Sequence, residues 1–423
     1  MTIPADIAQT LVDPKAYAAG APLDDAFTTL RHEMPFEIAQ PEGFDPFWVV
    51  TKQADVMAVE VQGKLFHNSP RPTVLSARDG EAFVRNLTGG EANLIRSLVS
   101  VDGDEHKALR GIGFPAFTPR SVNALADDIR DIAREFVDLM VSLGPQCDFA
   151  RDVALLYPLR VIMTVLGVPR EDEPFMLRLT QELFSASDPE LNREARENTP
   201  QEIMANLVQT MMDLERYFEG VTTEYRAHPQ NVVNSIIANA TINGEHLSRR
   251  QLMGYYIIAA TAGHDTTSNT ISAGFWALAE RPELYAQLRA DPSLVSGFIE
   301  ESIRWATPVK HFMRTAMDDT EIAGRKIAKN DWLMLSYHSA SRDEAVFDKP
   351  FEFDITRKFK QQIAFGYGPH VCLGQHLARL EMKILAEEIF ARISSLELAG
   401  VPARTISTFV CGPKSVPVRF TVN

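Results

Sequence analysis

The feature that most constrains this chain is a glycine-punctuated loop that presents a single cysteine and then runs into a helix. The loop reads "FGYGPHVCLG" from Phe365 to Gly374, and apolar residues at helical spacing follow over 375–393. Cys372 therefore lies just before a helix N-terminus, where backbone N–H groups and the helix dipole favour a thiolate. Because the glycines let a flat group approach the backbone closely, the loop predicts a thiolate that serves such a group.

Composition bounds the class of protein. The chain has 423 residues, 45% of them hydrophobic, and 42 basic against 56 acidic side chains give a net charge of −14. This composition is typical of a globular protein with a large core, and the acidic balance argues against nucleic acid or a membrane surface as the main partner. No apolar run approaches the roughly 18 residues of a membrane span.

The start of the chain and the cysteine count indicate the cellular compartment. The first residues, "MTIPADIAQTLVDP", lack the pattern of a secretory signal, and three cysteines are too few for a disulfide framework in a chain of this length. We therefore expect a cytoplasmic protein with reduced thiols, in which Cys147 and Cys411 are buried structural residues.

The periodicity predicts a mainly α protein with small β-sheets, organised as a single domain over 1–423. No repeat or flexible linker divides the chain. Strand-like stretches are few: 47–52, a hairpin around "AGRK" within 320–337, and "VPVRFTV" near the end. The clearest helical patterns cover 122–143, 152–166, 201–227, 249–280, 293–305 and 375–393.

A second motif lies inside the long apolar helix expected before Pro282. Ala262, Gly263, His264, Asp265, Thr266 and Thr267 place an acid and alcohols in an otherwise apolar segment. Threonine hydroxyls can bond back to the preceding turn and open the helix locally, so a back-bonded Thr or a surface stripe would explain the motif alone. Together with Cys372, an acid–alcohol pair on the other side of a flat cofactor suits the activation of oxygen on iron.

A third motif pairs Glu301 with Arg304, which are i and i+3 on one helical face. An isolated pair of this kind is usually solvated and contributes little to stability.

These motifs together resemble the defining set of the cytochrome P450 monooxygenases. The pattern Phe365-x-x-Gly368-x-x-x-Cys372-x-Gly374 is similar to the haem-thiolate loop, and Ala262-Gly263-x-Asp265-Thr266 to the oxygen-activating helix. Glu301-x-x-Arg304 resembles the family's buried pair, which Arg357 in the preceding meander would complete. His106-x-x-x-Arg110 resembles the helix that grips a haem propionate. All markers occur in the family's order, and stretches such as "TPVKHFMRTAMDDTEIAG" resemble the bacterial α-terpineol-hydroxylating branch.

The resemblance implies a P450 fold with haem b held between the long central helix and the cysteine-loop helix. Cys372 would be the axial thiolate. Asp265 and Thr266 would deliver protons and position dioxygen, while His264 should face away from the haem because neighbouring helical residues point about 100° apart. The remaining cofactor contacts implied by motif position are His106, Arg110, Arg314 and His370 for the propionates, and Phe365, Gly368, Gly374 and Ala262 along the ring.

The substrate wall is expected to be apolar. Lys310 and His311 depart from that pattern: they could bond a polar group of the substrate or turn toward a propionate, and we favour the second because an unpaired buried charge is costly. The 66–100 segment would close the roof. The other expected substrate contacts are Ile258, Ala259, Ala262, Val309, Phe312, Phe409, Val410 and Phe184.

The resemblance thus implies a bacterial, ferredoxin-dependent monooxygenase that inserts one oxygen atom of O2 into a C–H bond of a monoterpenoid or small aromatic hydrocarbon. Since the one fold occupies all 423 residues, electrons should come from a separate ferredoxin and its reductase, and we expect a monomer. A haem-thiolate peroxygenase and a non-catalytic haem sensor remain alternatives. The donor's docking face could be a positive patch of Lys107, Lys358, Lys360, Arg379 and Lys383.

Overall fold

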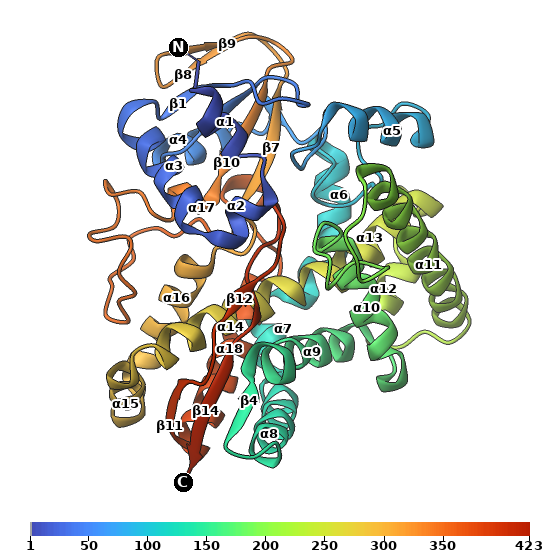
Figure 1. The fold of residues 1–423 in the computed structure, drawn as a ribbon. Helices are drawn as coiled ribbons and strands as arrows, with labels where there is room; N and C mark the ends of the chain where they lie inside the picture. The colour runs from blue at the N-terminus through green and yellow to red at the C-terminus, as the bar shows by residue number, and fades with distance from the viewer. Residues whose placement is uncertain (1) are drawn as a thin grey trace.

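The computed structural model describes residues 2–423, which form a sheet-bearing part and a larger helical part (Figure 1). The N-terminal segments wrap the five-stranded sheet at the top of the view, and most of the helices fill the right side, the centre and the lower part. The C-terminal strands return beside β4 at the bottom. No helix among residues 2–423 is long and apolar enough to cross a membrane.

The larger sheet combines strands from both ends of the chain. Its order is β1-β2-β10-β7-β3, with β10 parallel to β2 and the other neighbours antiparallel. Its strands, buried on most positions, are β1 (Phe36–Ala39), β2 (Phe47–Val50), β3 (Phe66–His67), β7 (His311–Ala316) and β10 (Trp332–Ser336).

Smaller β elements complete the fold. β11 (Ile393–Leu398), β14 (Pro417–Val422) and β4 (Gln146–Asp148) form a three-stranded sheet. The remaining strands form three hairpins: β5 (Thr241–Ile242) with β6 (Glu245–His246), β8 (Thr320–Ile322) with β9 (Arg325–Ile327), and β12 (Ala403–Arg404) with β13 (Pro413–Ser415).

The helices of the first half include those that hold the expected roof and propionate contacts. They are α1 (Ala5–Thr10), α2 (Pro14–Ala19), α3 (Ala21–Glu33), α4 (Gln53–Glu60), α5 (Arg78–Thr88), α6 (Gly103–Gly113), α7 (Pro119–Asn123), α8 (Ala126–Ser142), α9 (Leu156–Leu166) and α10 (Glu173–Phe184). A π-helical turn, η2 (Phe149–Ala154), precedes α9.

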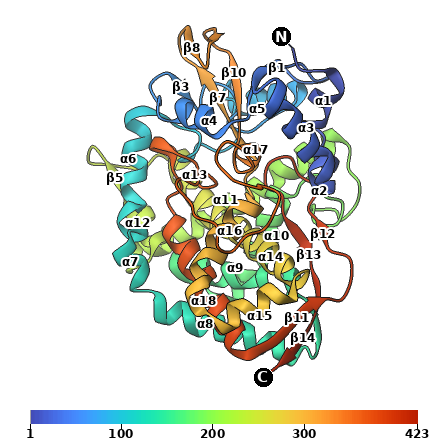
Figure 2. The same ribbon diagram turned by 90° about the vertical axis from the view of Figure 1, so that its left-hand side faces the viewer.

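The helices of the second half carry the other motifs. They are α11 (Pro200–Ala227), α12 (Val233–Asn239), α13 (Arg249–Ala262), α14 (Asp265–Ala279), α15 (Pro282–Ala290), α16 (Val295–Ala306), α17 (Tyr337–Ala340) and α18 (Gln375–Arg392). Figure 2 shows α16 and α18 side by side below the sheet, and they belong to one buried core together with α8, α9 and α14.

An aromatic triad fixes α14, α16 and α18 against one another. The rings of Phe275, Phe298 and Phe390 have centroids 5.6–6.1 Å apart. Edge-on and tilted aromatic contacts at this spacing add roughly 0.5–1.5 kcal/mol per pair beyond burial. The helix of each chemical motif is thus anchored to the other two.

The secondary structure confirms the mainly α prediction, with two differences. The helix predicted over 249–280 is broken at Gly263 and His264, where the sequence suggested a local opening, and the helix predicted over 122–143 is two helices, α7 and α8. The prediction that Cys147 is buried is wrong: it lies half-buried on the short edge strand β4, whereas Cys411 is buried.

Candidate haem site

The cysteine loop folds as a closed turn that ends at α18. The Cys372 N–H donates to the Phe365 carbonyl at 2.8 Å, which closes the loop on itself. Gly368 has φ +67°, in the left-handed region, and a Cβ there would lie 2.5 Å from the Glu60 carbonyl oxygen of α4. Only glycine satisfies both conditions, so this position presses the loop against α4.

The surroundings of the Cys372 thiol combine burial with stabilisation of a negative charge. Burial raises the pKa of Cys372, and the N–H groups of Gly374 and Gln375 together with the guanidinium groups of Arg110 and Arg379 oppose that shift. A thiol that coordinates iron is deprotonated outright, and the same N–H groups would then stabilise the thiolate. The Arg379 guanidinium also lies 4.6 Å from the centre of the Phe365 ring.

Four cationic or basic side chains expected at the propionates come together. The rings of His106 and His370 stack with centroids 3.9 Å apart. Burial lowers the pKa of His370 to about 2, and Arg314, His106 and Arg110 add to the shift by repulsion. Because these basic side chains repel one another, a negatively charged carboxylate bound among them would be stabilised.

Two of these side chains retain unsatisfied hydrogen-bonding capacity. The buried Nε2 atom of His106 has no partner among residues 2–423, and no hydrogen bond or ion pair holds the Arg110 guanidinium within the same described range. Arg is well suited to bind a carboxylate with two parallel hydrogen bonds. The donor set therefore fits a group with one metal ion bound by a thiolate and two carboxylates bound by cations, which is what haem requires.

Glu60 is a member of this region that the sequence analysis missed. The Arg314 Nη2 atom donates to Glu60 Oε1 at 3.2 Å, and the Tyr337 hydroxyl donates to the same oxygen at 2.6 Å. Burial raises the pKa of Glu60, with Arg314 and Tyr337 opposing the shift. The residue ends α4, more than 250 positions from its partners, and no local motif marks it.

The acid–alcohol motif lies at the break between α13 and α14. The Thr266 hydroxyl donates to the Ala262 carbonyl at 2.8 Å, the back-bond expected from the sequence. Ile258, Ala259, Ala262 and Thr266 are partly exposed, whereas the neighbouring Ile257, Ala260 and Thr261 are buried. Ile258 and Ala262 are i and i+4 on α13 and share one helical face. Thr266, in the first turn of α14, is hydrogen-bonded back to Ala262, so the expected substrate and oxygen contacts meet at the break between the two helices.

Asp265 and His264 occupy a drier environment. Both residues are buried, and burial raises the pKa of Asp265, with the electrostatic influence of the neighbouring His264 ring opposing the shift. His264 Nε2 lies 2.8 Å from the Leu155 carbonyl oxygen, so the ring points toward α9, away from the accessible face. This agrees with the orientation expected for His264.

The Glu301–Arg304 pair is fully buried rather than solvated. Arg304 donates from Nε and Nη2 to the two carboxylate oxygens of Glu301 at 2.8 and 2.6 Å, and both side chains are 0% exposed. Arg357 Nε donates to Glu301 Oε2 at 3.0 Å, which joins the meander as expected. Arg304 also donates to the Ser341 and Pro350 carbonyls, so the pair connects α16 to two loops.

The expected substrate wall is assembled from segments far apart in sequence. Val309 and Val410 form an antiparallel bridge, and the Lys310 N–H donates to the Phe409 carbonyl at 2.9 Å. The Phe409 ring lies 5.4 Å from Phe312 and 6.3 Å from Phe184, measured between centroids. An aromatic cluster thus joins β7, the loop between β12 and β13, and the end of α10.

The preference for Lys310 and His311 turning toward a propionate is wrong. Lys310 Nζ donates to the Ala306 carbonyl at 2.9 Å, and burial lowers the pKa of Lys310 to about 8. His311 Nε2 accepts from the Leu75 N–H at 3.1 Å, and its ring lies edge-on to Phe409. Backbone partners, which no side-chain motif reveals, decide both orientations.

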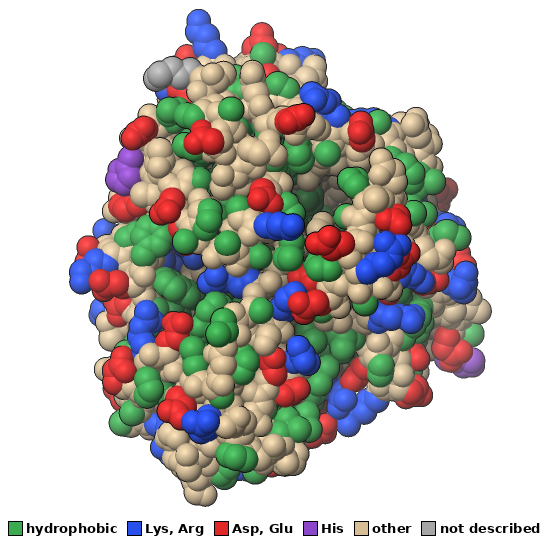
Figure 3. All heavy atoms as spheres, viewed as in Figure 1, with side chains coloured by type: hydrophobic (Ala, Val, Ile, Leu, Met, Phe, Trp, Pro, Cys, Tyr) green, Lys and Arg blue, Asp and Glu red, His purple; other side chains and the backbone are tan. Residues whose placement is uncertain are grey.

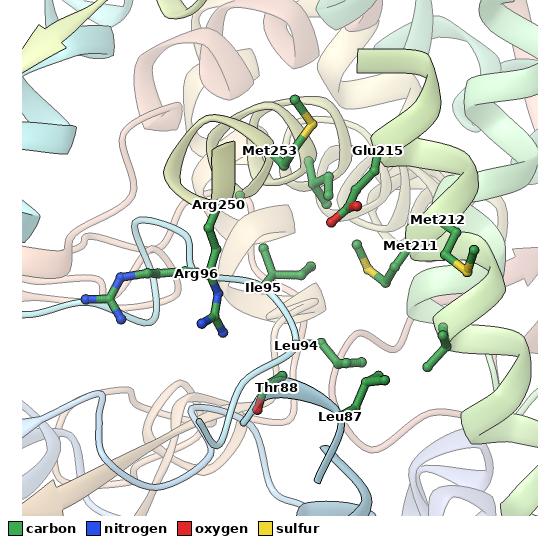
Figure 4. Close-up of a pocket in the computed structure, with 13 residues that line it drawn as sticks. Leu87, Thr88, Leu94, Ile95, Arg96, Met211, Met212, Glu215, Arg250 and Met253 are labelled. Atoms are coloured by element: carbon green, nitrogen blue, oxygen red, sulfur yellow. The ribbon is translucent and has the colours of Figure 1, made fainter. Parts of the chain in front are cut away.

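The roof segment borders a separate cavity of about 260 Å³ (Figure 4). Its apolar lining includes Leu87, Leu94, Met211, Met212 and Met253, and Arg96 and Arg250 extend beside it. None of the expected substrate contacts lines it. Its volume is below the roughly 300–1,000 Å³ typical of ligand pockets, so we do not assign the substrate to it.

The positive patch expected for an electron donor is largely neutralised. Lys107 pairs with Asp104 at 3.1 Å, Arg379 with Glu300 at 2.5 Å and Lys383 with Glu387 at 3.1 Å. Lys358 and Lys360 are exposed and have no ion pair within residues 2–423. On the face in Figure 3, charges of both signs are interspersed and the surface is hollowed near its centre.

A cysteine loop at a helix N-terminus, a cluster of basic side chains suited to carboxylates and a broken central helix are together the features expected of a haem-thiolate protein. A family model for cytochrome P450 matches residues 73–416. The chain therefore belongs to the cytochrome P450 family, whose members are monooxygenases with haem b as cofactor.

Named relatives extend the match to nearly the whole chain. Cytochrome P450-terp of Pseudomonas sp is 43% identical over 421 residues, which covers 99% of this chain and 98% of the relative. Linalool 8-monooxygenase of Pseudomonas putida is 30% identical and covers 96% and 98%, respectively. The crystal structure of CYP108D1 from Novosphingobium aromaticivorans is 44% identical, covers 100% of both chains and superposes with a TM-score of 0.92.

Proposed function

We propose that this P450 hydroxylates a C–H bond of a compact monoterpenoid with one atom of O2. The observation that carries the proposal is the aromatic cluster of Phe184, Phe312 and Phe409, which lies with the Val309–Val410 bridge in the expected substrate wall. Apolar surface of this kind favours a small hydrocarbon skeleton. The similarity to Cytochrome P450-terp and to a linalool monooxygenase supports a terpenoid over a larger substrate.

The proposed roles follow the chemistry of each side chain. Cys372 would supply the thiolate that holds the haem iron, stabilised by the Gly374 and Gln375 N–H groups, and His106, Arg110, Arg314 and His370 would bind the propionates. When bound, haem supplies the activation of dioxygen. Phe365, Gly368 and Gly374 would contact the haem from the cysteine side, and Ala262 would contact it from the opposite side.

Asp265 and Thr266 are the proposed groups for proton delivery. The Thr266 hydroxyl donates its hydrogen to the Ala262 carbonyl, so its oxygen remains free to accept a hydrogen bond from another group. Asp265 holds a proton more readily than an exposed carboxyl, because burial raises its pKa. Positioned acid–base groups contribute about 10²–10⁴-fold to rates.

The apolar contacts exclude water and orient the substrate. Ile258 and Ala259 are partly exposed positions of α13, and they would contact the substrate together with Phe312, Phe409, Val410 and Phe184. We propose a ferredoxin and its reductase as electron donors, a cytoplasmic location and a monomeric state. The single-domain organisation over 1–423 remains a prediction of the same kind.

The test is a binding and turnover screen. Monoterpenoid alcohols should shift the haem spin state at micromolar concentration and yield one hydroxylated product per NADH with a ferredoxin system. Long fatty acids and steroids should do neither. Peroxide-driven product without any ferredoxin requirement would favour the peroxygenase alternative, and binding without turnover would favour a sensor.

A further inference from the structure

His264 and Asp265 occupy the short break between α13 and α14. A Cβ on Gly263 would lie 2.9 Å from the Ile162 side chain, so α9 packs closely against this break. The π-helical turn η2 leads into α9 at Leu155, whose carbonyl receives the His264 ring. Such π turns occur frequently at functional sites.

The hydrogen bond to Leu155 determines which ring nitrogen of His264 carries hydrogen. A carbonyl oxygen can only accept, so Nε2, 2.8 Å away, is the protonated nitrogen. Nδ1 is buried and has no hydrogen-bond partner among residues 2–423. It lies 3.3 Å from Asp265 Oδ1, with the His264 side chain 0% and the Asp265 side chain 10% exposed.

With no proton between them, the lone pairs of His264 Nδ1 and Asp265 Oδ1 would repel each other in this buried environment. A proton on either atom converts that repulsion into an attractive contact. Within the part of the chain that the structure describes, His264 is the one ionisable group that shifts the pKa of Asp265. The next buried carboxyl against α14, Glu381 on α18, interacts with Thr267 instead.

We propose that His264 and Asp265 hold one proton jointly between Nδ1 and Oδ1, and that His264 is a positioning residue that keeps this proton available. The inference rests on the proposed role of Asp265 in proton delivery. In each turnover the pair would give this proton to the Thr266 side of the break, fall to a net charge of −1, and take a replacement from water. Two sites that share one proton retain it to higher pH than one site alone.

The first experiment replaces His264 with Gln, whose amide N–H can still donate to the Leu155 carbonyl but cannot hold an extra proton. The infrared carboxyl band of Asp265, isolated in ¹³C-aspartate-labelled ferric holoenzyme by subtracting Asp265→Asn, is titrated with pH. We expect the carboxyl to lose its proton at least about one pH unit lower in His264→Gln, a tenfold change in the proton-binding constant. The pH at which the yield of product per NADH falls on the alkaline side should decrease by the same amount.

The matched control is His338→Gln. His338 is another buried histidine paired with an aspartate, at 2.7 Å from Asp24, but it joins α17 to α3. This variant should leave both the Asp265 titration and the coupling profile unchanged. An Asp265 titration that is identical in the wild type and His264→Gln would overturn the proposal, even if the melting temperature falls.

A second measurement does not depend on the folding of His264→Gln. In the diamagnetic ferrous carbon monoxide complex, ¹⁵N shifts of His264 should show a protonated Nε2 and a hydrogen-bonded Nδ1, and Asp265→Asn should change the Nδ1 shift alone. An Nδ1 shift that is insensitive to Asp265→Asn would exclude the shared proton. Normal coupling in Asp265→Asn would instead overturn the proposed role of Asp265 and leave the proton sharing intact.

Discussion

The two sides of the proposed haem site are stabilised by different interactions. On the cysteine side, Glu301 and Arg304 are 0% exposed and form a bidentate pair that also binds Arg357. On the roof side, Glu91 pairs with Arg96 and Arg250, and these side chains are 35–42% exposed. Buried pairs are costly to break and exposed pairs contribute little, so we infer that the cysteine side is fixed and the roof adjustable.

The largest effect should come from removing the expected axial ligand. Cys372→Ala should lose the red-shifted absorption band of the reduced carbon monoxide complex, because that band reports a thiolate. Cys147→Ala and Cys411→Ala are the controls and should keep it, since one lies on an edge strand and the other is bonded to the Thr405 carbonyl. Retention of the band in Cys372→Ala would remove this residue from the site.

The next effect tests the rigidity of the cysteine side. Glu301→Ala leaves two buried guanidinium groups without their carboxylate and should cost about 3–5 kcal/mol of stability, with poor haem incorporation. Thermal melting and haem content measure the result. Glu397→Ala, which breaks an exposed pair with Arg419, is the matched control and should change stability by less than about 1 kcal/mol. Equal losses of stability in the two variants would show that the buried pair is no more important than the exposed one.

Substitutions at the break in the central helix should affect coupling rather than stability. Thr266→Ala should keep oxygen consumption but divert electrons to peroxide, because the hydroxyl bonded to the Ala262 carbonyl is lost. Thr270→Ala is the control, since its hydroxyl makes the same kind of back-bond, to the Thr266 carbonyl, one turn further along α14. The ratio of product to NADH distinguishes them, and wild-type coupling in Thr266→Ala would exclude it from the mechanism.

A smaller effect is expected on the roof. Glu91→Ala breaks the pairs with Arg96 and Arg250 that join the roof to α13. Exposed pairs are worth about 0–1 kcal/mol, so the melting temperature should scarcely change. A loss of stability comparable to that of Glu301→Ala would show that the roof is as fixed as the opposite side.

The smallest effect concerns electron delivery to the cysteine side. Lys358 and Lys360 are exposed and unpaired within residues 2–423, whereas Arg379 is tied to Glu300. Reversing both lysines to Glu should slow reduction by an acidic ferredoxin several-fold at low salt and less at high salt, because charges are screened beyond about 8–10 Å. Stopped-flow reduction rates measure this, and salt-independent rates equal to those of the parent would exclude the docking face.

The sequence by itself determined the motifs whose chemistry depends on short spacings. The Cys372 loop, the Glu301–Arg304 pair and the Thr266 back-bond each connect residues within about seven positions, so local geometry constrains them. Helical and strand periodicity likewise indicated the mainly α fold. The exact break at Gly263 and His264 required the packing of α9 against it.

Only the tertiary structure decided which distant groups meet. Arg314 binds Glu60 across 254 positions, His311 accepts from Leu75 across 236, and Arg379 pairs with Glu300 across 79. No periodicity or motif connects such partners, because their contact depends on how α4, β7 and α18 pack. The same reason explains why Lys310 bonds a backbone carbonyl instead of a propionate: a buried charge takes the partner that the fold brings to it.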